Sequence, residues 1–175
     1  MYITLPLPYE EIKKQLSPGD KISIVFCSAG ARICGYGGPE GAERLTEKLM
    51  KDGYNVVNTT ICGNPCNKGL VQQLAKNPIY EDAVDTVLIA GCAGFHVNAT
   101  SVFPDKKVIK TFTDTYGNAM VHMNTNTIII INPYMPALQD LGITEFPPEG
   151  LPFSKLLEAY RAKYPEYDLE QYPSW

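Results

Sequence analysis

The stretch KISIVFCSAGARICGYGGPEG, residues 21–41, decides the fold. It opens with a compact apolar run over residues 21–27 that is rich in β-branched residues, which predicts a buried strand. A glycine-rich loop follows. Pro39 and Glu40 then suit the first turn of a helix, where proline loses no hydrogen bond and an acid meets the positive end of the helix dipole. The stretch therefore predicts a strand, a tight loop and a helix in succession.

The same order recurs along the chain. After a short helix over residues 9–17, the patterns predict further helices over residues 39–51, 67–76 and 94–103, and further strands over residues 54–62, 86–92, 106–114 and 126–132. Strands that alternate with helices indicate right-handed crossovers and a parallel sheet. We therefore expect an α/β fold, a three-layer flavodoxin-like or Rossmann-like domain with a mostly parallel sheet and helices on both faces.

The amino-acid composition changes near Pro133, after which proline and tyrosine are frequent. We expect residues 1–132 to form the α/β domain that binds the metal or cluster. Residues 133–175 are expected to form a proline- and tyrosine-rich C-terminal extension, with a helix over residues 153–164, packed on that domain or on a partner. The acidic, aromatic tail at residues 166–175 predicts a strap across the domain's own surface; the alternative is a docking arm, because tyrosine and tryptophan anchor interfaces.

The amino-acid composition argues against some classes of function. The chain has 175 residues and a formal net charge of −4, which argues against non-specific nucleic-acid binding because that needs clustered lysine and arginine. No apolar run is long enough to predict a membrane span, and the N-terminus shows no signal-peptide pattern. These features predict a cytoplasmic protein. In a reducing compartment its five cysteines are not expected to form structural disulfides.

The cysteines gather at the ends of the predicted strands. Cys27, Cys62 and Cys92 end the first three strands, Cys34 follows in the first loop, and Cys66 precedes the second crossover helix. In a parallel sheet these strand ends share one edge, the carboxyl edge, where open α/β folds bind ligands. The topology therefore predicts that all five thiols converge on one place.

Several thiolates at one site indicate soft-metal chemistry, either a [4Fe–4S] cluster or tetrahedral zinc. Glycines surround the cysteines, and small residues let backbone N–H groups approach and hydrogen-bond the sulfides of a cluster. Zinc needs less room and fewer exposed amides. The sequence thus favours an iron–sulfur site, with a zinc-binding structural subunit that has no redox role as the alternative.

Two other interpretations stay open. The turn at Gly37 and Gly38 leads into a helix N-terminus and could cradle a phosphate in a metal-free nucleotide-binding protein, although its spacing matches neither G-x-G-x-x-G nor a P-loop. A plain tight turn explains these glycines equally well. Cys92 and His96 could form a nucleophilic pair, but that pairing leaves four cysteines without a role.

Three stretches together resemble the small cysteine-rich subunit of anaerobic methylenetetrahydrofolate reductases, the methylenetetrahydrofolate reductase C-terminal domain family. The first is CSAGARICGYGGPEG, a strand-ending cysteine followed by Cys-x-x-Gly-Gly and an acid. The second is CNKGLVQQL, in which a cysteine opens a crossover helix. The third is VLIAGCAGF, an apolar strand ending in Gly-Cys-x-Gly. The resemblance covers about residues 10–115.

The resemblance implies an iron–sulfur electron-transfer or accessory subunit in anaerobic one-carbon metabolism, itself non-catalytic. Its partner would be a flavin-bearing reductase subunit or another protein of that metabolism. The implied cluster ligands are Cys27, Cys34, Cys66 and Cys92. The family commonly has a further cysteine where this chain has Gly30, and its cysteine-rich C-terminal segment is missing here. Cys62 would either replace the missing ligand or line the strand end.

Overall fold

A computed structural model describes residues 1–122, 125 and 127–165 of the chain. The chain has an α/β fold, as predicted, and its first sheet has four parallel strands. In spatial order these strands are β3 (Asn55–Cys62), β2 (Lys21–Cys27), β4 (Thr86–Ala90) and β5 (Lys107–Lys110). The order reverses direction between β2 and β4. Such a reversal opens a crevice at the carboxyl ends of the two strands.

The central strands are the most apolar. All five residues of β4 are buried, and only Lys21 of β2 is exposed. Both strands are rich in valine and isoleucine, whose branched side chains suit a sheet that is covered on both faces. The register places Cys27 of β2 beside Cys62 at the end of β3.

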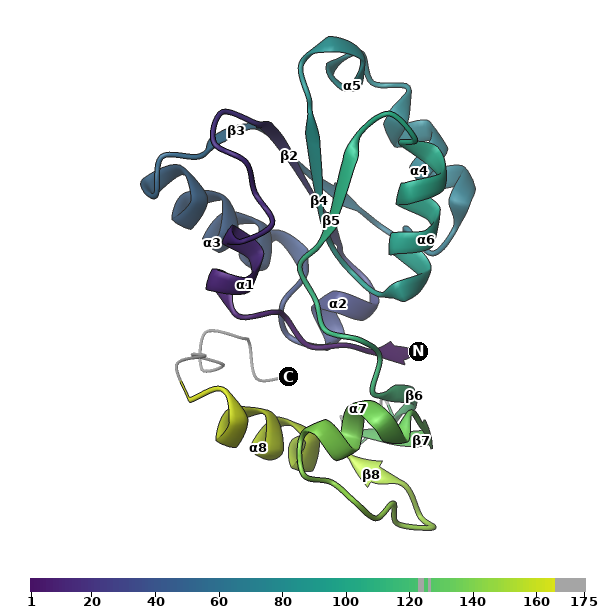
Figure 1. Cartoon of the computed structure of the whole chain (residues 1–175). Coiled ribbons are helices and arrows are strands. Elements are labelled where there is room, and N and C mark those ends of the chain that lie inside the picture. The colour runs from purple at the N-terminus through teal and green to yellow at the C-terminus, as the bar shows by residue number, and fades with distance from the viewer. Residues whose placement is uncertain (123–124, 126, 166–175) are drawn as a thin grey trace.

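Helices lie on both sides of this sheet, as Figure 1 shows. On one side α3 (Gly38–Lys51) packs against β2 and β3, and α1 (Tyr9–Lys13) lies near it. On the other side α4 (Lys68–Ala75) and α6 (Ala93–Val102) pack against each other. Two short helices that the patterns did not predict are α2 (Gly30–Ile33) and α5 (Ile79–Asp82).

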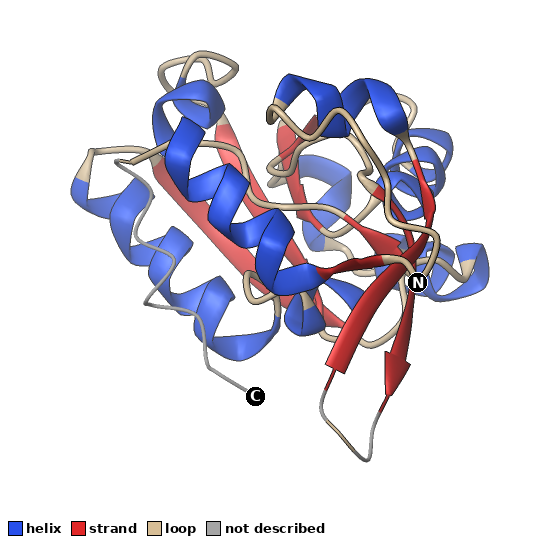
Figure 2. Cartoon of the chain, turned by 90° about the horizontal axis from the view of Figure 1, so that it is seen from below, coloured by secondary structure: helices blue, strands red, loops and turns tan. Residues whose placement is uncertain are grey.

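The second sheet corrects the expectation of one mostly parallel sheet. It is antiparallel, in the order β1 (Tyr2–Ile3), β6 (Gly117–His122), β7 (Thr127–Pro133) and β8 (Leu151–Pro152). The isoleucine run of β7 resembles a buried parallel strand, but β7 pairs with β6 as a hairpin, and Figure 2 shows the two strands projecting from the body. β6 escaped prediction because it starts with Gly117 and Asn118, which are poor strand formers.

The segment after β7 is more ordered than its prolines predict. Helix α7 (Met135–Asp140) begins within the expected loop, with Pro136 in its first turn, where proline is tolerated. Helix α8 (Phe153–Lys163) matches the predicted one. The boundary that we placed after residue 132 falls near the end of β7, and the division into domain and extension stays a prediction. The tail at residues 166–175 lies outside the described residues.

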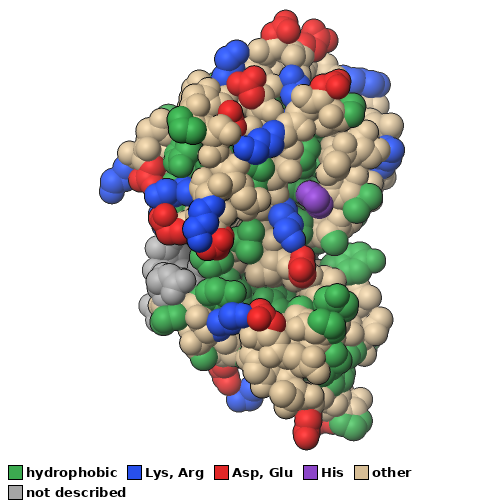
Figure 3. All heavy atoms as spheres, viewed as in Figure 1, with side chains coloured by type: hydrophobic (Ala, Val, Ile, Leu, Met, Phe, Trp, Pro, Cys, Tyr) green, Lys and Arg blue, Asp and Glu red, His purple; other side chains and the backbone are tan. Residues whose placement is uncertain are grey.

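The antiparallel sheet also differs from its surroundings in charge. None of the residues in its four described strands is charged. Met120 and Ile131 are about half exposed, at 49% and 50%. Figure 3 shows hydrophobic side chains gathered over the lower half of the molecule, whereas charged side chains are more frequent over the upper half. Within the described residues, no helix is long and apolar enough to cross a membrane.

Candidate functional site

The carboxyl edge of the parallel sheet carries the cysteines. Cys27 and Cys62 end β2 and β3, as predicted. Cys92 lies two residues beyond the end of β4, where it caps the N-terminus of α6. Cys34 is the last residue of the turn that α2 forms, and Cys66 lies one residue before the N-cap of α4. The loops that follow three strands therefore supply the thiols of this edge.

Cys66 and Cys92 form the closest described pair, with their Sγ atoms 3.4 Å apart. The side-chain amide of Asn98 on α6 donates to the carbonyl oxygens of Pro65 and Cys66, at 3.0 Å each, and so holds the Cys66 loop against α6. Gly94 lies against the pair, because a Cβ atom there would be in van der Waals contact with both sulfurs, 3.7 Å from the Sγ of Cys66 and 3.9 Å from that of Cys92.

Two thiols of this edge have raised pKa values. Burial raises the pKa of the Cys34 thiol to about 12, and the neighbouring Cys92 and Cys27 add to the rise. Burial also raises the pKa of Cys66, again with contributions from Cys92 and Cys27. Like charges this close disfavour one another's ionisation. Without a cation the Cys34 and Cys66 thiols therefore resist ionisation at neutral pH, and a bound metal would reverse that preference.

Cys62 lies at the same edge as these four. Burial raises the pKa of its thiol, with a further contribution from Cys27. Cys62 neighbours Cys27 across the β2–β3 pairing. The structure thus places all five cysteines at the carboxyl edge of the sheet and brings the Sγ atoms of Cys66 and Cys92 closest together.

A buried tyrosine, Tyr36, lies near the thiols. Its hydroxyl is 2.5 Å from the Oγ1 of Thr4 and donates a hydrogen bond to the carbonyl oxygen of Gly91. Burial raises the pKa of Tyr36 well above its usual value, with Cys34 as the next cause. Sequence analysis missed this network because Thr4 is 32 residues from Tyr36 and 87 from Gly91. In the sequence, the one signal that could have indicated this network is an aromatic residue, Tyr36, between Gly35 and Gly37.

The structure explains Gly37 and Gly38 by packing and backbone conformation. A Cβ atom at Gly37 would meet the carbonyl oxygen of Cys27 and lie 2.7 Å from the Cβ of Ala31. Gly38 has a φ of +72°, which only glycine adopts without strain. The space beside Gly37 is filled by protein, so this turn supports the plain-turn interpretation more than a phosphate cradle.

His96 lies on α6, four residues after Cys92. Burial lowers the pKa of its imidazole, and Lys110 lowers it further. The ring is therefore neutral at pH 7. The structure gives no hydrogen bond between His96 and a thiol of the described site, so the pairing of Cys92 with His96 gains no support.

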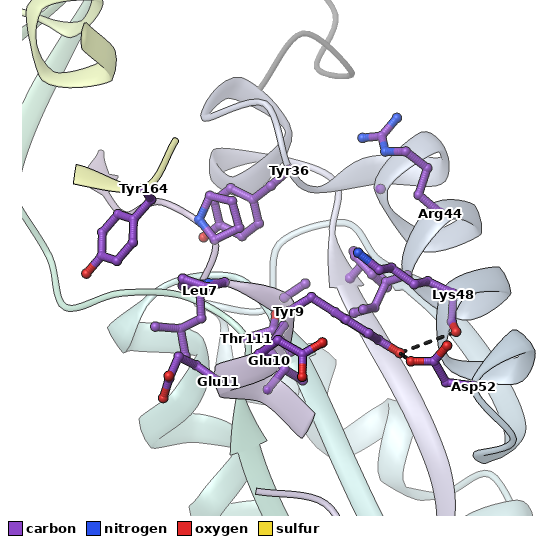
Figure 4. A pocket seen from close by; sticks show the side chains of 17 residues that line it. Leu7, Tyr9, Glu10, Glu11, Tyr36, Arg44, Lys48, Asp52, Thr111 and Tyr164 are labelled. Carbon is purple, nitrogen blue, oxygen red and sulfur yellow. Dashed lines mark hydrogen bonds between the residues drawn. The ribbon is translucent and has the colours of Figure 1, made fainter. Parts of the chain in front are cut away.

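A groove of about 970 Å³ lies on the other side of Tyr36. Its floor includes Phe26, Tyr36 and Thr111, all buried. The N-terminal segment with α1 lines one wall and α3 lines the opposite wall, as Figure 4 shows. Tyr164, at the end of α8, lies at the rim. Tyr36 thus lies between the thiols and this groove.

The arrangement offers soft sulfur ligands and small glycine-lined spaces. Across the described residues, no group of three or more histidine, cysteine, aspartate or glutamate side chains is gathered closely enough to hold a metal ion. All five cysteines are free thiols. The described site therefore consists of free thiols at one edge of the sheet.

Comparison with known protein families gave no matching family model. Comparison with curated proteins also gave no match. Fold and site together define the class of protein, an α/β protein with a thiol cluster at the carboxyl edge of its parallel sheet. The resemblance to the reductase subunit stays a prediction.

Proposed function

We propose that this chain binds one [4Fe–4S] cluster through Cys27, Cys34, Cys66 and Cys92, and serves as an electron-transfer or accessory subunit. The observation that carries the proposal is the grouping of four thiols from three loops at one sheet edge. The Sγ atoms of Cys66 and Cys92 lie 3.4 Å apart, and Cys27 ends the strand beside β4 at the same edge. When bound, such a cluster accepts and releases electrons at a potential set by its surroundings.

The spacing of the thiols bears on the choice between a cluster and zinc. Zinc binds four sulfurs at about 2.3 Å, so all four must lie within about 4 Å of one another. The described residues hold no group of that kind. In a cluster each cysteine binds a different iron, and the ligands stand farther apart. The glycines near the cysteines in the sequence remain the reason for proposing iron–sulfur over the zinc-binding structural subunit.

The chain's own residues would shape the environment of the cluster. Gly94 lies against the sulfurs of Cys66 and Cys92, where its lack of a side chain would let its backbone approach a bound cluster. Tyr36 and Phe26 would exclude water from the inner side, since both are buried. Cys66 is exposed, so electrons would pass to a partner most directly on its side of the site.

The fold also supports a ligand site at the carboxyl edge of the parallel sheet. We propose that the parallel sheet with α1 and α3 on one side and α4 and α6 on the other is a three-layer flavodoxin-like or Rossmann-like domain. Its strand order reverses between β2 and β4. The thiols of Cys27 and Cys92 follow these two strands, which is where such folds bind ligands.

The resemblance supplies the biological setting of the proposal. It suggests anaerobic one-carbon metabolism in the cytoplasm, with a flavin-bearing reductase subunit or another protein of that metabolism as partner. Catalysis would then occur in the complex.

Five single cysteine-to-serine substitutions test the ligand set. Each protein is purified without oxygen, reconstituted with iron and sulfide, and assayed for iron content and visible absorbance. We expect Cys27→Ser, Cys34→Ser, Cys66→Ser and Cys92→Ser to lose most bound iron, and Cys62→Ser, the matched control, to retain it. Equal iron content in all five variants would contradict the proposed ligands.

A further inference from the structure

Cys66 and Cys92 are in contact with each other through their sulfur atoms. The two Sγ atoms lie 3.4 Å apart. A disulfide bond is about 2.05 Å long, so the sulfurs need to approach by only about 1.4 Å to form one. A small rotation of one side chain provides such a movement. The pair is therefore arranged for a bond between its own two sulfurs.

The two cysteines differ in how far solvent reaches them. Cys66 is exposed, whereas Cys92 is buried, with 9% of its surface accessible. The other three cysteines are also buried. A small molecule in solution therefore meets the sulfur of Cys66 first, and the sulfur of Cys92 lies next to it.

Hydrogen bonds hold the loop that carries Cys66, residues 63–67, against α6. The side-chain amide of Asn98 on this helix donates to the carbonyl oxygens of Pro65 and Cys66, at 3.0 Å each. Cys92 is the N-cap of the same helix. Asn98 thus fixes the position of Cys66 relative to Cys92.

The helices that follow the two cysteines are also fixed to each other. Helices α4 and α6 pack together, and Figure 1 shows them side by side. The Nζ of Lys68 on α4 donates to the Oγ of Ser101 on α6 at 2.6 Å. Phe95 and Ala99 of α6 are fully buried. Two reacting groups held in place in this way act as if each were present at high concentration.

We propose that Cys66 and Cys92 form a thiol–disulfide exchange site that takes a small disulfide as its oxidant, with Asn98 as a positioning residue. First, Cys66 loses its proton, and its sulfur attacks one sulfur of the small disulfide, whose S–S bond breaks. One thiolate leaves and takes up a proton.

In the second step Cys92 loses its proton, and its sulfur attacks the Sγ of Cys66. The bond between Cys66 and the small molecule breaks, and the second thiolate leaves and takes up a proton. The two cysteines have then lost two electrons and two protons. The small disulfide has gained them and has become two thiols.

This disulfide is reversible, because reduced thiols in excess drive the same exchange backwards. In a reducing compartment such bonds are transient and serve catalysis or redox sensing. The exchange site goes beyond the proposed function, and it does not depend on whether the thiols hold a cluster. The disulfide would withdraw two of the four proposed ligands, so the oxidised chain would not hold a cluster through them.

The experiment equilibrates the metal-free, full-length chain with a fixed ratio of oxidised to reduced glutathione, blocks the remaining thiols, and maps disulfides by mass spectrometry. Burial and Cys92 raise the pKa of the Cys66 thiol to about 12, which slows exchange, so the equilibrium is measured rather than the rate. We expect the chain to lose two hydrogen atoms and the Cys66 and Cys92 peptides to be linked. No iron is present, so the result is separate from that of the iron assay.

Two variants test the order of the steps. Cys92→Ser should keep one glutathione on Cys66, because no second sulfur displaces it. Cys62→Ser is the matched control and should form the Cys66–Cys92 disulfide as the wild type does. A predominant disulfide between other cysteines, glutathione that stays on Cys66 in the wild type, or no oxidation of Cys66 would overturn the exchange site.

Asn98→Asp tests the positioning residue, because a carboxylate has nearly the same size and no N–H to donate. It should lower the ratio of disulfide to dithiol about three- to ten-fold at the same glutathione ratio, as expected for the loss of one or two hydrogen bonds. Val97→Ala, at a position of α6 that is 67% exposed, should leave the ratio unchanged. Circular dichroism verifies that each variant is folded. An unchanged ratio in Asn98→Asp would overturn the role of Asn98.

Discussion

The two sheets of this chain differ in what their strands carry. The strands of the parallel sheet and the loops that follow them hold all five cysteines, and the sheet is flanked by helices on both sides. The antiparallel sheet has no cysteine and, in its described strands, no charged residue. Parallel strands bring successive loops to one edge, whereas hairpin strands send them to opposite ends. Connectivity, more than composition, therefore explains why the chemistry gathers at one sheet.

The N-terminal segment joins the two sheets beside the thiols. Tyr2 and Ile3 pair with β6 in the antiparallel sheet. Thr4, the next residue, contacts Tyr36 and the carbonyl oxygen of Gly91 at the edge of the parallel sheet. The thiol site thus depends on contacts from both sheets, and the following predictions separate their contributions.

The largest effect is expected in the core of the parallel sheet. Leu88 of β4 is fully buried, so Leu88→Ala should lower the free energy of unfolding by about 2–5 kcal/mol through lost burial and a cavity. Met120→Ala, on the half-exposed face of β6, should cost less than about 1 kcal/mol. Urea denaturation of the metal-free proteins measures both, and equal losses would contradict the contrast between the sheets.

The next effect distinguishes two glycines at the cysteine edge. Gly37→Ala should destabilise the protein by about 1–3 kcal/mol, because its methyl group would press on the Cys27 carbonyl and on Ala31. Gly63→Ala should change stability by less than about 0.5 kcal/mol, since nothing lies within 4 Å of a Cβ atom there. Thermal unfolding of the two variants measures this difference. A neutral Gly37→Ala would show that the turn has room for a ligand.

A smaller effect depends on pH at the junction of the sheets. Burial raises the pKa of Tyr116 to about 12, so the folded state holds this proton more tightly than the unfolded state does. The resulting stabilisation is complete below pH 10 and is lost as the pH rises toward 12. The free energy of unfolding should therefore fall by about 1–2 kcal/mol less in Tyr116→Phe than in the wild type as the pH rises from 10 toward 12.

Tyr2→Phe provides the control for that measurement, because Tyr2 is 47% exposed on β1. Denaturation curves recorded between pH 8 and 11.5 give the stability of each variant. Identical pH dependence in both variants would show that Tyr116 is not desolvated at the junction.

The smallest effect concerns ion pairs on the antiparallel half. Lys163 of α8 lies 2.5 Å from Asp140 of α7 and also donates to the Asp140 carbonyl oxygen. Lys163→Ala should cost less than about 1 kcal/mol, because the pair is exposed. Lys155→Ala breaks a pair within one helical turn and should cost only a few tenths of a kcal/mol. A larger cost for Lys155→Ala in urea denaturation would contradict this order.

The sequence predicted the parallel half well, because its strands are continuous apolar runs with clear ends. The runs at residues 21–27 and 86–90 are buried on both faces, and this burial leaves a strong signal. The antiparallel half was harder to predict because β1 and β8 have two residues each and form only through long-range pairing. Their register depends on partners more than 20 residues away in sequence, which no local pattern encodes.

The candidate site also has one part that the sequence predicted and one part that it did not. Strand ends predicted that the cysteines would lie at one edge, and the structure places them there. The contact between the Sγ atoms of Cys66 and Cys92 depends on side-chain directions that spacing does not give. The Tyr36 network depends on Thr4, which the chain brings back from its N-terminus.

The most direct test of the central claim is the amount of iron, acid-labile sulfide and zinc per wild-type chain purified without oxygen, with a visible spectrum. The account predicts about four irons and four sulfides with a broad brown absorbance. One zinc per chain without colour would contradict it and make the protein a structural zinc subunit. No metal after reconstitution would remove the thiol cluster as the functional site.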